Sequence, residues 1–277
     1  MTNAHCAVSD ILWTSPSPVR TDMASTPRVS LQAAWILHHY PYRDSSLLLE
    51  VFSREYGRVG LVARGARAAR GRWHNQLQML QPLWLSWNLR GELGTLTDVD
   101  TRAQAPRVAG RQVLSACYLN ELLLRLLSRH DPHPDLFDIY ERALALLPVA
   151  EEQALRCFEK QLLQELGYGL LLDCEADGIT PVVAGTRYEY RLEAGPVRCA
   201  QQRADGIYLD GASLLALRDE QLDSTHACRE VKALMRAALA VYLGARPLKT
   251  RMVSRQLSSF TRSGLHGVVA GEGGQPG

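Results

Sequence analysis

The chain has 277 residues, of which 46% are hydrophobic and 22% are charged, and its formal net charge at pH 7 is +2. This composition predicts about two globular domains, and a net charge so close to neutral means that any affinity for a polyanion must come from local basic patches. The longest apolar run, residues 119–127, is broken by polar residues and is far too short to span a membrane. The N-terminus lacks the basic-then-apolar order of a signal peptide.

The six cysteines are scattered, and no two of them are spaced as CxxC. This argues against a disulfide framework and against a closed zinc site, so we expect thiols in a reducing cytosol and no bound metal. The chain also lacks the phosphate-binding, nucleophile, metalloprotease and dinucleotide motifs, GxxxxGK[ST], GxSxG, HExxH and GxGxxG. We therefore predict no catalytic residues and no cofactor.

Residues 1–27 are rich in Ser, Thr and Pro and show no periodicity. We expect a disordered N-terminal extension, and Met23 is an alternative first residue. From residue 28 to residue 106 the pattern is a period-2 alternation, which predicts strands near 29–37, 47–51, 59–63, 83–87 and 93–101, with Pro41 ending the first. Five strands without helical periodicity indicate a small barrel, for which a five-stranded oligonucleotide-binding (OB) barrel is the economical choice and an SH3-like barrel the alternative.

The segment from residue 54 to residue 73 is unusually rich in arginine. Arginines without intervening acids, except Glu55, suit phosphate groups, and an adjacent aromatic residue is typical of single-strand binding surfaces. The alternative is a solvated surface loop. The residues that we predict to contact DNA here are Arg54, Arg58, Arg64, Arg67, Arg70, Arg72 and Trp73.

From Pro106 onward the period becomes helical. Apolar stripes predict helices near 109–129, 134–148 and 155–167, a short helix at 211–217, and a last long helix that stops at Gly244. Tyr188 to Cys199 is expected to form a hairpin. We thus predict a helical domain over residues 107–260 with a small insertion at about 174–200, followed by a disordered tail at 261–277.

Two further features of the helical region predict binding surfaces. A second basic strip, Arg246, Lys249 and Arg251, follows the last long helix, and Pro247 should keep it extended; the alternative is that these charges only complement the helix dipole. In the first helix, an apolar groove rimmed by arginine would suit an acidic peptide with a C-terminal aromatic residue, although a simply buried helix is the alternative. The groove residues are Leu122, Arg125, Leu127 and Arg129.

Taken together, several segments resemble the bacterial recombination mediator family RecO. They are Arg43-Asp44-Ser45-Ser46-Leu47, the Phe52–Arg67 block, Tyr118-Leu119-Asn120-Glu121-Leu122, Arg156 with Phe158-Glu159, Leu166-Gly167-Tyr168-Gly169, and the stretch from Tyr242 to Arg251. The resemblance implies an N-terminal OB domain, a helical C-terminal domain, and a non-enzymatic role in recombinational repair at the nucleoid in the cytoplasm. It also implies binding of single- and double-stranded DNA, annealing of complementary strands, recognition of the tail of single-strand-binding protein, and loading of RecA together with RecR.

This sequence departs from the family in one respect. Some members carry a four-cysteine zinc module between helices, whereas only Cys174 and Cys199 fall in that region here, without CxxC partners. We therefore expect no zinc and a remnant hairpin. Two hypotheses remain open: a DNA-binding mediator that anneals strands, and an adaptor that does not bind DNA and whose barrel binds a partner protein.

Overall fold

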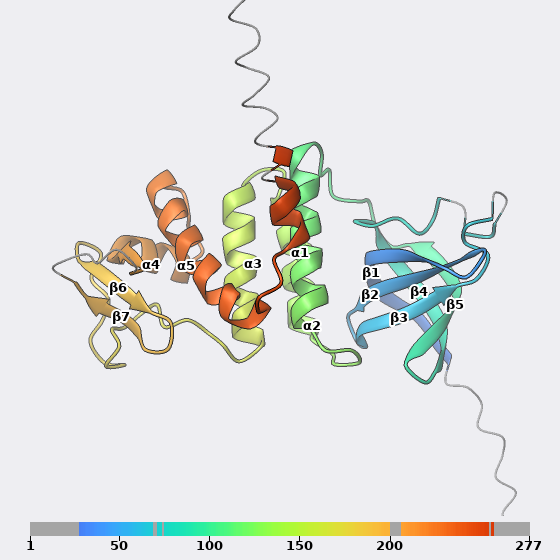
Figure 1. The fold of residues 1–277 in the computed structure, drawn as a ribbon, viewed down its shortest axis with the longest axis horizontal. Helices are drawn as coiled ribbons and strands as arrows, with labels where there is room; N and C mark the ends of the chain where they lie inside the picture. Colours follow the sequence, from blue (N-terminus) through green and yellow to red (C-terminus); the bar gives the residue numbers. More distant parts are fainter. Residues whose placement is uncertain (1–27, 69–70, 74, 200–205, 255, 258–277) are drawn as a thin grey trace, which may run out of the picture.

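The computed structural model describes residues 28–68, 71–73, 75–199, 206–254 and 256–257. A barrel forms one end of the molecule, helices form the middle, and a small sheet lies at the opposite end (Figure 1). The ranges predicted to be disordered, 1–27 and 261–277, lie outside the described residues.

Five strands close into the barrel in the order β1-β2-β3-β5-β4. Their bounds are β1 (Arg28–Tyr42), β2 (Ser46–Ser53), β3 (Gly57–Ala63), β4 (Pro82–Arg90) and β5 (Leu93–Thr101). All neighbouring strands are antiparallel except β3 and β5, which run parallel. The predicted five-stranded OB barrel is thereby confirmed.

The interior of the barrel follows from the period-2 alternation, because every second side chain of a strand points to the same face. Val51, Leu61, Leu85 and Trp87 are fully buried in this interior. Trp73, from the long connection between β3 and β4, joins the same core and is only 5% exposed. The connection that carries the arginines is thus anchored to the barrel by its own tryptophan.

The prediction that Pro41 ends the first strand was wrong. β1 continues through Pro41 to Tyr42, and Pro41 lies opposite Leu47 of β2. Proline is tolerated there because β1 pairs with β4 only as far as Trp35, so the missing N–H faces no second neighbour.

Helices and one small sheet follow the barrel in the chain. The first three helices are α1 (Arg111–Leu126), α2 (Pro134–Leu146) and α3 (Glu151–Glu165), and the last two are α4 (Gly211–Arg218) and α5 (Thr225–Leu243). Between α3 and α4 lies a sheet of order β7-β6-β8, made of β6 (Arg187–Arg191), β7 (Gly195–Arg198) and β8 (Tyr208–Asp210). The sequence predicted only a hairpin here, since the three residues of β8 are too few to show a period.

The barrel and the helices share a continuous apolar core. Trp35, Leu37 and Phe52 point out of the barrel and are buried among helical residues. The Phe52 ring lies 5.5 Å from that of Phe137, and the Trp35 ring lies 5.6 Å from that of Tyr140. The two domains therefore meet as a packed interior, not as two surfaces separated by water.

Gly57 allows this close approach at the start of β3. Its φ is +62°, and a Cβ atom at this position would lie 1.9 Å from the carbonyl oxygen of Asp131. Only glycine combines a positive φ with the absence of a side chain. The backbone of β3 can therefore lie directly against the link between α1 and α2.

Candidate nucleic-acid interface and partner pocket

The loop after β3 presents two exposed arginines at the end of the barrel away from the helices (Figure 1). The main-chain N–H of Arg67 donates to the Ser45 carbonyl at 2.8 Å, and its guanidinium donates to the Arg43 carbonyl at 3.3 Å. Arg64 and Arg67 have no acidic partner among the described residues. Both charges are therefore available to an anion. Arg70 lies outside the described residues.

Trp73 is not the exposed stacking residue that the sequence predicted. Its indole is buried, and its Nε1 donates to the Arg64 carbonyl at 3.0 Å. The neighbouring Arg72 guanidinium lies 4.6 Å from the indole ring centre and pairs with Asp98 at 3.1 Å. Trp73 thus holds the loop in place. The Arg72 side chain is 64% exposed, but Asp98 would compete with a phosphate group for its guanidinium.

The assignment of Arg54 and Arg58 to DNA also needs correction, because both bind the helical domain. Arg54 donates to both carboxylate oxygens of Asp138 on α2, at 3.1 and 2.8 Å. This hydrogen bonding, together with a weaker contribution from Glu55, raises the pKa of Arg54. Arg58 donates to Glu50 at 3.0 Å and to the carbonyls of Leu124 and Leu127 at 2.7 and 3.0 Å.

The contacts of Arg58 satisfy carbonyl groups at the C-terminal end of α1. The last carbonyls of a helix have no partner within the helix, and they carry partial negative charge that a cation stabilises. Glu50 on β2 completes the arrangement, because it also pairs with Arg129. Arg58 and Arg129 therefore serve the domain junction.

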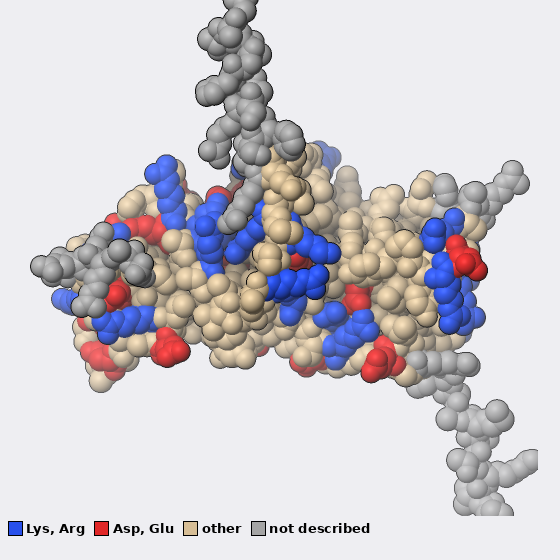
Figure 2. All heavy atoms as spheres, viewed as in Figure 1, with Lys and Arg blue, Asp and Glu red and all other residues tan. Residues whose placement is uncertain are grey.

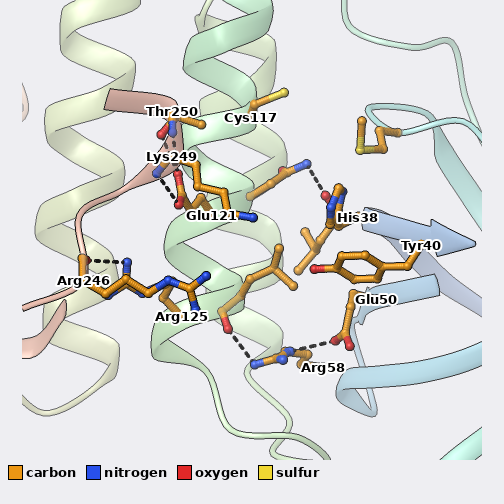
Figure 3. A pocket seen from close by; sticks show the side chains of 14 residues that line it. His38, Tyr40, Glu50, Arg58, Cys117, Glu121, Arg125, Arg246, Lys249 and Thr250 are labelled. Carbon is orange, nitrogen blue, oxygen red and sulfur yellow. Dashed lines mark hydrogen bonds and ion pairs between the residues drawn. The ribbon is translucent and has the colours of Figure 1, made fainter. Parts of the chain in front are cut away.

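The predicted groove on α1 is also replaced by a different arrangement. Leu122 and Leu127 are 0% and 3% exposed and belong to the helical core, so they cannot line a groove. Of the four predicted groove residues, Arg125 alone lines a pocket, which lies between β1, α1 and the segment after α5, with a volume of about 380 Å³ (Figure 3). The pocket is lined by Leu37, His38, Tyr40, Glu50, Arg58, Met79, Cys117, Asn120, Glu121, Leu124, Arg125, Arg246, Lys249 and Thr250.

Arg125 holds the segment after α5 against α1. Its guanidinium donates to the Leu243 carbonyl and, at 2.9 Å, to the Arg246 carbonyl. The side chains of Arg246 and Lys249 are exposed and have no acidic partner among the described residues. The pocket thus combines an apolar wall with cations at its mouth.

The second basic strip is only partly extended. Pro247 lies in an irregular link, as predicted, but residues 249–254 are helical. Glu121 of α1 caps this last helix, because its carboxylate accepts from the main-chain N–H groups of Lys249 at 2.7 Å and Thr250 at 2.9 Å. Burial raises the pKa of Glu121, but hydrogen bonds from Thr250 and Lys249 and the charge of Arg125 outweigh it, and the net pKa is lowered.

Arg251, the third member of the strip, is engaged inside the domain. It lies over the Tyr118 ring at 5.7 Å and is half-buried. The strip therefore offers Arg246 and Lys249 to an anion. Lys and Arg gather over the middle of the molecule, where these segments lie, and again on the barrel (Figure 2).

His38 and Tyr40 of β1 also line the pocket. Burial lowers the pKa of His38, and the charges of His39 and Lys249 lower it further. No local pattern could have found this site, since its walls come from β1, α1 and a segment more than a hundred residues further along the chain.

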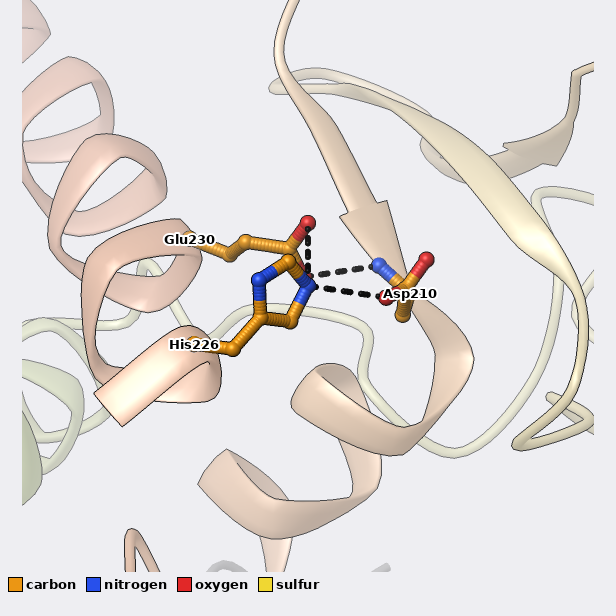
Figure 4. Close-up of side chains that lie close together, drawn as sticks. All are labelled: Asp210, His226 and Glu230. Atoms are coloured by element: carbon orange, nitrogen blue, oxygen red, sulfur yellow. Dashed lines mark hydrogen bonds and ion pairs between the residues drawn. The ribbon is translucent and has the colours of Figure 1, made fainter. Parts of the chain in front are cut away.

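One cluster of potential metal ligands exists among the described residues: Asp210, His226 and Glu230 (Figure 4). The Arg187 guanidinium donates to Asp210 at 2.8 Å and to Glu230. The main-chain N–H of Asp210 also donates to Glu230, at 2.9 Å. Because the Arg187 guanidinium and the Asp210 N–H already donate to these carboxylates, the cluster does not fit a cation. Cys174 and Cys199 belong to no such cluster in the described part of the chain.

Two family models together cover most of the chain. The model described as "Recombination protein O N terminal" matches residues 28–105, and "Recombination protein O C terminal" matches residues 109–252. The DNA repair protein RecO of Alkalilimnicola ehrlichii is 46% identical over 241 residues, which cover 86% of this chain and 96% of the relative. The chain belongs to the RecO family.

Other RecO proteins agree with this assignment. That of Nitrosococcus oceani is 46% identical over 232 residues, covering 83% of this chain and 94% of the relative, and that of Coxiella burnetii is 41% identical over 227 residues, covering 82% and 98%. These matches confirm the resemblance to the RecO family and the fold that the resemblance implied. This RecO family member is a DNA repair protein. No helix in the described residues is long and apolar enough to cross a membrane.

Proposed function

We propose that this RecO family member is a non-enzymatic mediator that binds single- and double-stranded DNA and anneals complementary strands. With RecR it would help to load RecA onto DNA coated by single-strand-binding protein. The observation that carries the proposal is the set of exposed cations without acidic partners among the described residues, Arg64 and Arg67 on the barrel loop and Arg246 and Lys249 after α5. Guanidinium and ammonium groups in such positions pair with phosphate oxygens and release counterions.

The two basic segments differ in what surrounds them. The barrel loop is an open surface, which suits a phosphate backbone, and contacts to phosphate position a strand without reading its sequence. The cations of the second segment border a pocket with apolar residues such as Leu37 and Leu124. This combination supports the pocket as the site for the acidic tail of single-strand-binding protein, with an apolar side chain inside and carboxylates on Arg246 and Lys249.

The salt dependence of DNA binding tests the proposal against the adaptor alternative. The full chain is titrated against a labelled single-stranded oligonucleotide and its duplex at several salt concentrations. For a DNA-binding mediator, log K falls linearly with log salt, by about 0.7 per contacted phosphate on single strands and about 0.9 on duplex. The double variant Arg64→Ala/Arg67→Ala should reduce the slope by about 0.7 on single strands, or about 0.9 on duplex, for each phosphate contact that is lost.

Arg111→Ala is the matched control, because the Arg111 side chain is 81% exposed but pairs with Glu151 on the helical domain. The control should bind with the wild-type slope. A chain whose oligonucleotide binding is absent, or does not respond to salt or to the double substitution, would be an adaptor and not a DNA-binding mediator.

A further inference from the structure

We propose that Tyr168 and Tyr242 form a surface platform on which an unpaired base of single-stranded DNA stacks. The inference rests on the proposed function and adds to it a second kind of contact, with bases instead of phosphates. The two rings are parallel to within 23°, their centres are 4.0 Å apart, and the residues are 47% and 40% exposed.

The stacked pair is open to solvent. Each ring covers one face of the other, so the exposed area lies on their outer faces and edges. Val241, the neighbour of Tyr242, is 60% exposed as well. Exposed aromatic rings are surfaces on which bases stack, and any base can do so because every base has a π-face.

Both rings are held in position by the ends of their helices. Tyr168 follows the end of α3, where Gly167 has φ +83° and the main-chain N–H of Tyr168 donates to the Leu163 carbonyl at 2.8 Å. This is a helix end of the Schellman type. Tyr242 lies in the last turn of α5, and Arg125 fixes that turn through the Leu243 carbonyl. A platform that is already ordered loses little conformational entropy when a base binds.

The charges near the platform suit the backbone of the same strand. Arg246 follows Tyr242 by four residues, is exposed, and is anchored at its carbonyl by Arg125. A strand whose base stacks on the tyrosines could continue along its backbone toward this cation. Stacking also uses only the face of the base and leaves its pairing edge open, so a strand held in this way can still meet its complement.

The first test uses the full chain and a single-stranded oligothymidylate with one 2-aminopurine, whose fluorescence is quenched by stacking. Wild type should quench it, and Tyr242→Leu and Tyr168→Leu should abolish the quenching and weaken binding by roughly tenfold. The loss should appear equally at every salt concentration, since stacking releases no counterions. Arg246→Ala should instead change the salt slope.

Tyr242→Phe is the matched control, because it keeps the ring and should bind like wild type. Duplex affinity should be unchanged in all the tyrosine variants, since paired bases cannot stack on a protein surface. Melting temperatures show whether each variant is folded; if a leucine variant is unfolded, the quenching by wild type and by Tyr242→Phe still decides.

The outcomes separate the two proposals. A wild-type chain that binds oligonucleotide in a salt-dependent way but does not quench 2-aminopurine would overturn this inference alone. The same holds if the folded leucine variants bind as wild type does, or lose single-strand and duplex affinity equally. A wild-type chain that binds no oligonucleotide would overturn the proposed function and this inference together.

Discussion

Arg58 and Arg64 belong to one run of sequence, yet their surroundings give them opposite roles. Arg58 is 19% exposed and donates to Glu50 and to two carbonyls of α1, whereas Arg64 is exposed without an acidic partner among the described residues. Without Arg58, the two helix-end carbonyls lose their donor and the buried Glu50 carboxylate keeps only Arg129, which destabilises far more than the loss of a solvated charge.

Arg58→Ala should therefore lower the free energy of unfolding by about 2–4 kcal/mol. Arg64→Ala, the matched variant, should change it by less than about 0.5 kcal/mol. Urea unfolding measures both, and fluorescence anisotropy with a single-stranded oligonucleotide should show the reverse order, with the larger loss for Arg64→Ala. Equal effects of the two variants on stability would contradict the role of Arg58 at the junction.

The tertiary contacts of single residues could not be predicted from the sequence. The arginine-rich composition located the basic loop, but it could not show that Arg54 and Arg58 reach Asp138 and Leu124, which are 84 and 66 residues away. Nor could it show that the Trp73 indole is buried in the barrel core, because an aromatic residue beside arginines has the same pattern whether it faces in or out.

Among the elements, those with a clear period were predicted best. Alternation located β5 over Leu93–Thr101 as observed, and the helical pattern located α1 to α4 and the end of α5 to within a few residues. The helix at residues 249–254 was missed, because its stability comes from Glu121 of α1 and not from its own sequence. A cap supplied by another helix leaves no local signal.

The Glu121 cap should make the stability of the helix at residues 249–254 depend on pH. The pKa of Glu121 is lowered below its ordinary value of 4.5 in the folded chain, so its stabilising contribution is complete above that value and is lost as the pH falls through the lowered pKa. The protection of the peptide 246–254 against hydrogen exchange, taken relative to the intrinsic exchange rate at each pH, should accordingly fall as the pH drops below 4.5.

Glu121→Gln should show fast exchange in this peptide already at neutral pH, with a weaker dependence on pH in the acid range. Glu193→Gln, at an exposed position in the turn between β6 and β7, is the control and should exchange like wild type. The idea fails if the Gln variant keeps both the protection and the acid response of the wild-type peptide.

At the scale of the whole molecule, the shared core at Phe52, Trp35 and Phe137 holds two basic segments in a fixed relation. Annealing requires that two strands be close while their repulsion is reduced and their base edges stay open. Phosphate contacts at both segments would do this, and the effect should weaken as salt screens the charges.

Arg246→Ala/Lys249→Ala should therefore slow annealing more than it weakens the binding of one oligonucleotide, and so should Arg64→Ala/Arg67→Ala. A fluorescence annealing rate is measured beside an anisotropy affinity, with Arg111→Ala as the control. A normal annealing rate in the first variant would show that the segment after α5 does not handle DNA, and would favour contact with an acidic protein tail.

β3 begins beside the α1–α2 link at Gly57 and ends at the basic loop, so its length sets the distance between the helical domain and that loop. Its seven residues span roughly 20 Å at about 3.3 Å per residue, which equals about six steps of stacked bases at about 3.4 Å each. A DNA strand that binds Arg64 and Arg67 and also reaches the start of β3 at the domain junction must therefore span about this distance.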